Sequence, residues 1–353
     1  MSDRREFLRV AGAAGVYAMT RGAIRMGGQT RREVTIGPRR VRVIDAHAHC
    51  VIPVTDVVKG TPLEKMGGGG GNNNLLGPAR LQIMDQQGVD VQALTINNFW
   101  WYAADADLAR QICLAQNEGL AAWVKQHPDR FVATATVALQ HPELAAEQLQ
   151  DGVKRLGLRG ASIGCHVNGE DLSLPKFDPF WAKAAELGVP VFTHPGGAEN
   201  IVKEGAFRGR GDLGNIIGNP LETTYLLSRL IFDGTFDKFP GLRVIGAHAG
   251  GYLPSYFGRT EAACEFRGNA KCANTKRPSE YLRSQIVIDT MVFSDEGLRH
   301  LVAEAGAGQV ICGTDVPFNW PVTVDLVLNA KSVSDADKEA ILSTNLRNLL
   351  RIE

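Results

Sequence analysis

The chain has 353 residues, of which 44% are hydrophobic and 22% are charged. This composition is that of an ordinary globular protein, and the length suits one large α/β domain. Basic and acidic residues balance at 38 each, so no overall charge favours binding to nucleic acid or to an anionic membrane. The six cysteines are scattered and form no CxxC pair, so they predict neither a disulfide framework nor a zinc finger.

Residues 1–40 form a basic N-terminal segment that we separate from the rest of the chain. Residues 1–42 hold ten arginines and three acidic residues. Within them, two arginines and a Phe-Leu pair in Asp3–Arg9 precede a weakly apolar run, Val10–Met19. This pattern resembles a twin-arginine export signal. The run is shorter than the roughly 20 residues that span a membrane. We therefore expect an exported, periplasmic protein without a stable membrane span, or a cytoplasmic protein if the signal is not used.

From residue 41 to residue 353, short apolar runs alternate with longer amphipathic ones. The apolar runs predict eight strands, near residues 41–47, 90–96, 131–137, 158–164, 189–194, 242–248, 284–289 and 309–314. Helical patterns occupy residues 77–88, 105–126, 141–156, 178–187, 221–233, 294–305 and 334–350. Strands that alternate with helices in this number predict a (β/α)₈ TIM barrel. A doubly wound open sheet is the main alternative, but no GxGxxG pattern follows a strand.

Five side chains that can bind a metal ion or a proton stand at the ends of the predicted strands. His47 and His49 close the first strand, His194 the fifth, His248 the sixth and Asp315 the eighth. Side chains two residues apart on a strand point the same way, so the first two imidazoles converge. In a barrel, the C-terminal ends of all strands surround one face, where barrel enzymes carry their catalytic groups. The sequence therefore predicts a metal site at this face, although a surface or core position is the alternative for any single histidine.

These strand-end residues resemble the signature of the amidohydrolase superfamily: HxH on strand 1, histidines on strands 5 and 6, and an aspartate on strand 8. More closely, the sequence is similar to the amidohydrolase 2 group and its aminocarboxymuconate-semialdehyde decarboxylase branch. The stretches that carry this likeness are Arg80–Val89, Val91–Leu94, His166–Asn168, Glu222–Thr224, Phe239–Leu242, His248–Gly251 and Gly313–Phe318. The resemblance covers about residues 40–350 and implies the TIM barrel and its metal centre.

The resemblance implies that His47, His49, His194 and Asp315 bind the metal. Such ligands suit Zn²⁺, with Mn²⁺ as the alternative. Superfamily members with a second metal use a carboxylated lysine on strand 4, and Leu158–Ile163 contains no lysine, so we expect one ion. A divalent ion lowers the pKa of its bound water to about 7. The resemblance makes His248 the general base beside this water, and it gives Asp315 a second role in handling protons.

Two substrate-binding residues also follow from the resemblance. Arg259 matches a family arginine that reaches a neighbouring subunit's site and binds a substrate carboxylate, a task that suits a guanidinium group. This match implies a homodimer or a higher homo-oligomer. His166 matches the family's histidine after strand 4 and is expected to line the pocket. A surface salt bridge for Arg259 and a structural role for His166 are the alternatives.

The chain departs from the muconate-type decarboxylases around the pocket. A second carboxylate-binding arginine of that branch precedes the first helix, where this chain has glycine and asparagine, with only Arg80 close by. The loop after strand 5 offers Phe207 and Arg208 in place of the family's aromatic residue. Both departures count against the muconate acid itself as the substrate, and we expect an unsaturated or aromatic carboxylic acid.

The residues and the resemblance together predict a metal-dependent non-oxidative decarboxylase. The alternative is a metal-dependent hydrolase of a lactone, ester or amide, because the same metal-bound water, with His248 and Asp315, can attack a carbonyl. Fold and metal site do not separate these two reactions. A metal-binding protein without turnover is a third alternative, against which the presence of both His248 and Asp315 counts.

Overall fold

The computed structural model describes residues 31–68 and 74–353. The chain divides into two units, Met1–Thr30 and Arg31–Glu353. The twin-arginine pattern lies outside the described residues, so the export signal stays a prediction. In the part of the chain that is described, no helix combines the length and the apolar character needed to cross a membrane.

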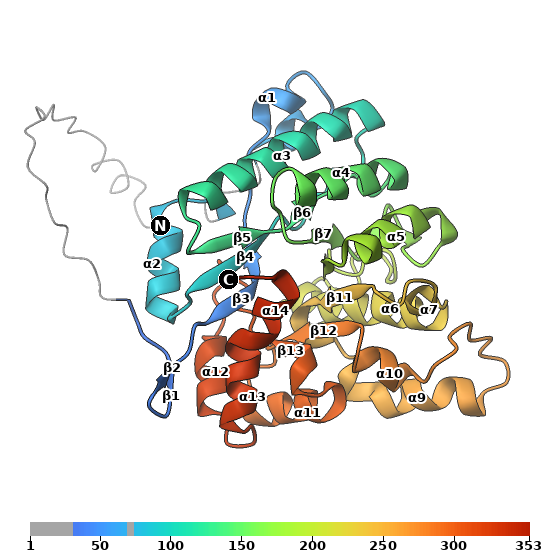
Figure 1. The fold of residues 1–353 in the computed structure, drawn as a ribbon. Helices are drawn as coiled ribbons and strands as arrows, with labels where there is room; N and C mark the ends of the chain where they lie inside the picture. The colour runs from blue at the N-terminus through green and yellow to red at the C-terminus, as the bar shows by residue number, and fades with distance from the viewer. Residues whose placement is uncertain (1–30, 69–73) are drawn as a thin grey trace, which may run out of the picture. The chain divides into compact units, whose positions relative to one another are not determined.

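Parallel strands form the centre of the unit Arg31–Glu353 (Figure 1). One sheet has the order β3 (Ile44–His49), β4 (Val91–Thr95), β5 (Phe131–Ala133). The other has the order β13 (Val310–Ile311), β12 (Ile286–Asp289), β11 (Arg243–Gly246), β10 (Pro190–His194), β7 (Ala161–Gly164), β6 (Ala135–Thr136). The pairings within both sheets are parallel. Because β5 and β6 are successive pieces of one predicted strand, they link the two sheets.

This arrangement confirms the predicted TIM barrel, with one difference from an ideal barrel. The strands do not form a single unbroken ladder, and backbone hydrogen bonds cross the gap between the first and last strands. The Ala46 amide donates to the Cys312 carbonyl, and the Asp315 amide donates to the His47 carbonyl, both at 2.8 Å. Ala48 also forms a parallel bridge with Val316. The chain from β13 onward therefore lies beside β3, at the level of the predicted metal ligands.

Two predicted strands end earlier than the apolar pattern suggests. The sixth strand, β11, ends at Gly246 rather than at residue 248, because His248 and Ala249 have left-handed φ angles of 53° and 59°. The eighth strand, β13, ends at Ile311. Asp315, beyond it, also has a positive φ, of 57°. Two residues expected to take part in chemistry thus stand in tight turns immediately after their strands.

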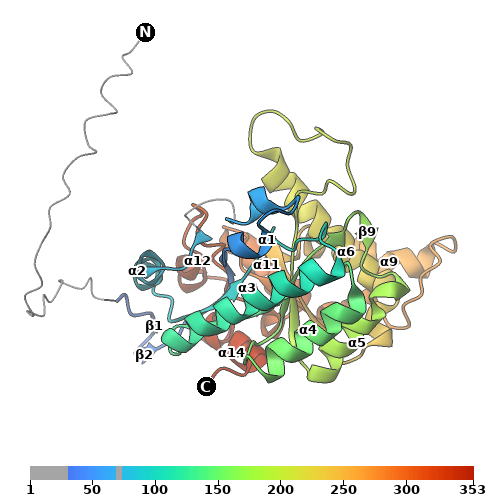
Figure 2. The same cartoon turned by 90° about the horizontal axis from the view of Figure 1, so that it is seen from above.

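Helices cover the outside of the strands (Figures 1 and 2). Their bounds are α1 (Thr55–Val58), α2 (Pro78–Gln87), α3 (Ala106–Gln126), α4 (Pro142–Lys154), α5 (Asp178–Leu187), α6 (Asn219–Phe232), α7 (Thr235–Lys238), α8 (Ala247–Gly250), α9 (Phe257–Phe266), α10 (Pro278–Leu282), α11 (Asp295–Ala305), α12 (Thr323–Asn329), α13 (Asp335–Glu339) and α14 (Asn345–Leu350). Local signals set several ends: Asp105 caps α3 by accepting from the Leu108 amide, and Ser294 caps α11 by accepting from the Gly297 amide.

The main apolar core joins strands to helices. Leu94 and Val244 on strands, and Leu149 and Leu230 on helices, are all completely buried in one cluster. Each such side chain contributes about 1.5–3 kcal/mol by leaving water. Two small antiparallel pairs lie outside the barrel strands: β1 (Thr35–Ile36) with β2 (Arg39–Arg40), and β8 (His166–Val167) with β9 (Glu170–Asp171).

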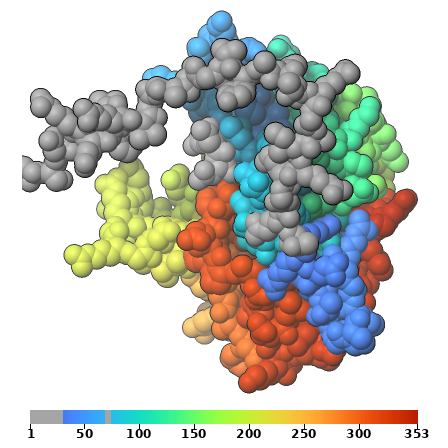
Figure 3. Space-filling view, turned by 90° about the vertical axis from the view of Figure 1, so that its left-hand side faces the viewer, coloured from blue at the N-terminus to red at the C-terminus, as the bar shows by residue number. Residues whose placement is uncertain are grey.

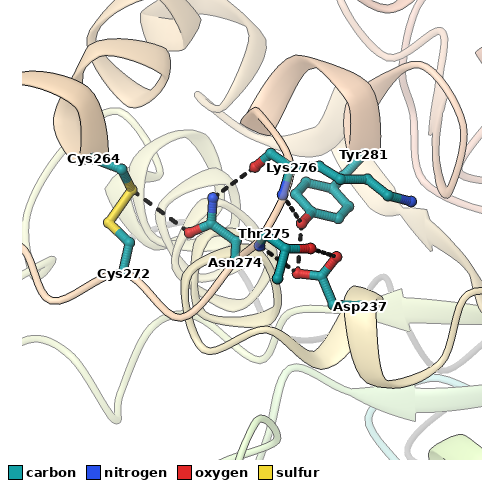
Figure 4. Close-up of a disulfide and its surroundings, with 7 residues drawn as sticks. All are labelled: Asp237, Cys264, Cys272, Asn274, Thr275, Lys276 and Tyr281. Atoms are coloured by element: carbon teal, nitrogen blue, oxygen red, sulfur yellow. Dashed lines mark hydrogen bonds between the residues drawn. A yellow bond between two sulfur atoms is a disulfide. The ribbon is translucent and has the colours of Figure 1, made fainter.

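A disulfide joins Cys264, near the end of α9, to Cys272 (Figure 4). The scattered cysteine positions do not predict it, because nothing in the sequence distinguishes this pair from the other four. Those four are buried and free: Cys50, Cys113, Cys165 and Cys312. The sulfur atoms of the pair are 1.98 Å apart.

The segment after this disulfide is held by Asp237, from α7. The carboxylate accepts hydrogen bonds from the Thr275 amide at 2.8 Å, the Thr275 hydroxyl at 2.7 Å and the Tyr281 hydroxyl at 2.6 Å. Figure 4 shows these groups gathered beside the disulfide. Burial opposes ionisation of Asp237, but the hydrogen bonds from Tyr281 and Thr275 prevail and lower its pKa. The loop between α9 and α10 is therefore fixed at both ends.

Candidate metal centre

The strand ends bring the five predicted residues together. The ligand atoms of His47, His194, His248 and Asp315 lie within 4.8 Å of one another. His49 adjoins this group, because its Nε2 atom lies 3.2 Å from His47 Nε2 and 2.9 Å from Asp315 Oδ1. The resemblance names His49 among the ligands and His248 as the base, whereas the most compact group of ligand atoms contains His248. We call these five residues the metal cluster.

The outer ring nitrogen of His194 is available to a metal ion. The Pro195 carbonyl lies 2.8 Å from His194 Nδ1, and because a carbonyl can only accept, that nitrogen carries the proton. The Nε2 atom of His194 is then a free acceptor, and it is buried without a hydrogen-bond partner among the described residues. Buried polar atoms rarely stay unpaired. Histidine nitrogens and a carboxylate in this arrangement fit one divalent ion.

Asp289, at the end of β12, orients two members of the metal cluster. Its Oδ2 atom lies 2.8 Å from His47 Nδ1 and accepts from the His248 amide at 3.1 Å. Its Oδ1 atom accepts from the amides of Ala249 at 2.7 Å and Met291 at 3.2 Å. A carboxylate behind a ligating histidine fixes the tautomer and leaves the other ring nitrogen to the metal. Asp289 therefore supports a ligand and the proposed base at once.

Asp45 holds the first and last strands together below the metal cluster. It accepts hydrogen bonds from the His47 amide at 3.0 Å, the Thr314 amide at 3.0 Å and the Thr314 hydroxyl at 2.6 Å. Gln92 donates to the same carboxylate at 3.0 Å. Burial dominates its electrostatics and raises the pKa of Asp45. These contacts fix the position of His47 relative to the turn that carries Asp315.

Asp289 and Asp45 are not among the residues predicted from the sequence. The signal for Asp289 was available, since it is an acidic residue at the end of the predicted strand 284–289, as Asp315 is after the eighth. Asp45 gives a weaker signal, because it lies inside a strand, where its hydrogen-bond partners are contributed by residues far away in the sequence. Gly313 is explained by the same crowding: a Cβ atom there would lie 2.8 Å from the Cβ of Asp289 and 3.1 Å from that of His47.

The charges in the metal cluster are strongly coupled. Burial opposes protonation of His47, but Asp315 and Asp289 prevail and raise its pKa to about 10. Burial likewise opposes ionisation of Asp315, yet His47 and His49 hold the pKa of Asp315 below its usual range. Burial, helped by the charge of His47, lowers the pKa of His248 to about 4. His248 is therefore neutral near pH 7 and can accept a proton.

The predicted substrate-binding residues lie in different places. Arg259 is on the exposed surface of α9 and, among the described residues, makes no ion pair or hydrogen bond with the metal cluster. His166 is partly buried, and its Nε2 atom lies 3.8 Å from Glu222 Oε1. Arg80 is buried and donates to the backbone carbonyl of His49, so it supports the strand that carries two cluster residues. Arg80 therefore contacts the strand that carries two cluster residues, His166 lies near Glu222, and Arg259 is exposed on α9.

A long segment between β10 and α6 borders the metal cluster. Residues 199–217 project away from the barrel as an arm, which is yellow-green in Figures 2 and 3. A cavity of about 900 Å³ is lined mostly by the arm itself, with Gly196, Gly197 and Asn219 at its edge. No residue of the metal cluster is among the residues that line this cavity.

Comparison with known proteins places this architecture among related chains. Residues 44–352 match a family described as amidohydrolase. A 2-amino-3-carboxymuconate-6-semialdehyde decarboxylase from Dictyostelium discoideum is 32% identical over 283 residues, which cover 78% of this chain and 76% of the relative. A gamma-resorcylate decarboxylase from a Rhizobium species is 30% identical over 286 residues, covering 78% of this chain and 86% of that one.

A solved structure is also similar over most of the chain. It is the crystal structure of a dihydroxybenzoic acid decarboxylase from Polaromonas sp. JS666, with bound manganese and the inhibitor 2-nitroresorcinol. Its TM-score is 0.77 at 27% identity, and the match covers 88% of this chain and 97% of that chain. The three relatives are all decarboxylases by name.

Proposed function

The chain belongs to the amidohydrolase family, and we propose that it is a metal-dependent, non-oxidative decarboxylase of an unsaturated or aromatic carboxylic acid. The observation that carries this proposal is the buried convergence of His47, His194, His248 and Asp315 at the strand ends, in a chain 30–32% identical to named decarboxylases. A hydrolase would use the same residues, but the relatives described above give no support to hydrolysis.

In the proposed reaction, His47, His49, His194 and Asp315 hold one divalent ion. When bound, the ion supplies the positive charge that orients and polarises the substrate's oxygen atoms. The bond from the substrate carbon to its carboxyl group breaks, CO₂ leaves, and a proton takes its place on that carbon. His248 and Asp315 manage this proton, since His248 Nε2 lies 3.9 Å from Asp315 Oδ2 and His248 is neutral.

Metal content and CO₂ release test the proposal together. Purified protein is analysed for bound metals and incubated with a panel of hydroxybenzoic and muconate-type acids, while dissolved CO₂ is measured. We expect about one equivalent of metal, since the described residues contain one cluster of ligand atoms, and CO₂ release that stops on chelation. Conversion of a lactone, ester or amide to an acid at constant carbon count would identify a hydrolase instead, and a metal-free wild type would refute the site.

We further propose Zn²⁺ as the resident ion, because three imidazoles and one carboxylate suit it. The manganese in the Polaromonas relative makes Mn²⁺ the specific competitor. Elemental analysis of protein from unsupplemented cells, followed by reconstitution of chelated protein with each ion, distinguishes them. Full activity with Mn²⁺ and little with Zn²⁺ would overturn the choice of zinc.

We propose a homodimer, or a higher homo-oligomer, in which Arg259 binds a carboxylate at the partner's site. Its exposure on α9, away from the metal cluster of its own chain, supports this role. Co-expressed Arg259→Ala and His248→Asn chains provide the test, because each variant alone lacks a needed group. A mixed dimer regains one complete site if Arg259 acts across the interface. If Arg259 acts within its own chain, mixed dimers stay inactive.

We propose that the protein is exported. The twin-arginine pattern at residues 3–19 supports this, and so does the Cys264–Cys272 disulfide, because disulfides persist in oxidising compartments such as the periplasm. Cell fractionation of wild type and of a variant with Arg4 and Arg5 both changed to Lys provides the test. We expect to find the wild type in the periplasm and the variant retained in the cytoplasm. A wild type confined to the cytoplasm would refute export.

A further inference from the structure

Glu222, on α6, is a buried carboxylate outside the metal cluster, and only 1% of its surface is exposed. Its Oε2 atom accepts hydrogen bonds from three consecutive backbone amides, those of Gly196 at 2.9 Å, Gly197 at 2.9 Å and Ala198 at 2.6 Å. Hydrogen bonds from amides to a carboxylate are stronger than those between neutral groups. Glu222 therefore fixes the path of the chain immediately after β10.

The hydrogen bond from the Gly196 amide to Glu222 is linked to His194 through one peptide unit. The carbonyl of Pro195 and the amide of Gly196 belong to the same rigid peptide unit. That carbonyl accepts from His194 Nδ1 at 2.8 Å, while the amide donates to Glu222. The imidazole, the peptide unit and the carboxylate thus form one chain of hydrogen bonds, in which each bond polarises the next. Asp289 contacts His47 directly, whereas Glu222 reaches His194 through a peptide.

The second oxygen of Glu222 faces His166. Glu222 Oε1 is buried, has no hydrogen-bond partner among the described residues and lies 3.8 Å from His166 Nε2. The Gly169 amide donates to His166 Nδ1 at 3.0 Å, so in the neutral ring Nε2 carries the proton. The protonated nitrogen of His166 is therefore the one that lies 3.8 Å from Glu222, too far for a hydrogen bond but close enough for electrostatic attraction. One carboxylate connects a cluster histidine with the histidine expected to line the pocket.

We propose that Glu222 is a positioning residue of the metal centre. Its Oε2 atom sets the orientation and tautomer of His194 through the Pro195–Gly196 peptide, and its Oε1 atom orients His166. The inference rests on the proposed metal site, since it treats His194 as a ligand. It adds a residue that the metal does not touch and that supports both the ion and the substrate side of the site.

Metal affinity is the readout, measured by competition with a chromophoric chelator. Outer partners of ligating histidines typically contribute about 10–100-fold to metal affinity, so we expect a loss of that size in Glu222→Ala. Glu222→Gln keeps a carbonyl oxygen for the three amides but turns an NH₂ group towards the N–H of His166. This variant should bind metal about as tightly as wild type but show a raised KM. A residue with a purely structural role would change metal affinity and KM together.

Glu261→Ala is the matched control. Glu261 also accepts several hydrogen bonds, from Arg277 Nε at 2.5 Å and from the amide and hydroxyl of Ser279 at 2.9 Å each, but it lies on α9. This control should lower the melting temperature and leave metal affinity unchanged.

Unchanged metal affinity in a folded Glu222→Ala, or an equal loss in Glu261→Ala, would overturn the inference. Should Glu222→Ala not fold, Glu222→Asp replaces it, because the shorter side chain keeps the charge but withdraws the carboxylate from the amides. It must then bind metal more weakly than wild type, and equal binding would refute the positioning role. A wild type that binds no metal would refute the proposed function itself, which is a separate outcome.

Discussion

At the scale of single residues, His248 and Asp315 combine a proposed role in the reaction with an unusual backbone conformation. Both have left-handed φ angles, of 53° and 57°, a conformation that is costly for residues other than glycine. The surrounding hydrogen bonds maintain this conformation: Asp289 accepts from the amide of His248, and the His47 carbonyl accepts from the amide of Asp315. Two of the left-handed residues of the described chain thus stand where the reaction is proposed, and hydrogen bonds from neighbouring strands support them.

His248→Asn is expected to separate chemistry from metal binding. Asparagine is similar in size but cannot take up a proton, and a positioned general base contributes about 10²–10⁴-fold to rate. We expect kcat for CO₂ release to fall by that amount while metal content stays near wild type. Both are measured on the same preparation. Undiminished turnover with full metal content would remove His248 from the mechanism.

Asp289→Asn is expected to weaken the metal centre. The amide NH₂ group would face two of the four donors that the carboxylate now accepts from, so His47 would lose its orientation. We expect metal affinity to fall by about 10–100-fold, as for other carboxylates behind ligating histidines. Chelator competition measures the change. An affinity equal to wild type would show that His47 needs no such support.

At the scale of elements, the barrel strands could be predicted from the sequence, whereas the region around α9 and α10 could not. Alternating apolar runs mark each barrel strand within a few residues, because burial on both faces demands β-branched and apolar side chains there. The helix α9 gives a weak pattern, since it has one buried residue, Phe257, and exposes Phe266, while α10 and α12 are short. The Cys264–Cys272 bridge and Asp237 stabilise this region by local contacts that leave no periodic signal.

Asp237→Asn is expected to destabilise the region around α10 in a pH-dependent way. The folded-state pKa of Asp237 is lowered below the unfolded value, about 3.9 for aspartate. Its carboxylate therefore contributes stability that is fully present above pH 4 and is lost as the pH falls through the lower folded-state pKa. We expect the wild type to unfold at higher temperature than the variant near pH 7.

Thermal denaturation of both proteins between pH 3 and pH 8 measures this difference, which should shrink towards the acid end. A gap that stays constant across the range would mean that the charge of Asp237 has no part in it.

At the scale of the whole molecule, the metal centre connects parts of the chain that are far apart in sequence. Its members come from β3, from the end of β10 and from the turns after β11 and β13. The spacing of these residues in the sequence predicts that they meet, because a barrel brings all strand ends to one face. It does not predict the carboxylates behind them, since Asp45, Glu222 and Asp289 acquire their partners only when the barrel is formed.

Metal removal is expected to lower the stability of the whole unit. An ion that binds only the folded state stabilises it by RT ln(1 + [L]/Kd), about 2.7 kcal/mol at a free concentration of 100 Kd. The chelated protein should therefore unfold at lower temperature, and adding back the ion should raise the transition progressively with its concentration. Scanning calorimetry follows this titration. A transition that does not respond to the ion would mean that the cluster binds no metal in the folded protein.

The contacts of Glu222 divide the segment after β10 into two parts. The amides of Gly196, Gly197 and Ala198 are tied to Glu222, whereas beyond them the arm carries an exposed pair, Glu204 and Arg208, with side chains 94% and 80% accessible. The backbone next to His194 is therefore held by a carboxylate from α6, independently of the exposed Glu204–Arg208 pair. Substitutions at Glu204 or Arg208 are expected to leave metal affinity unchanged, which competition with a chelator measures.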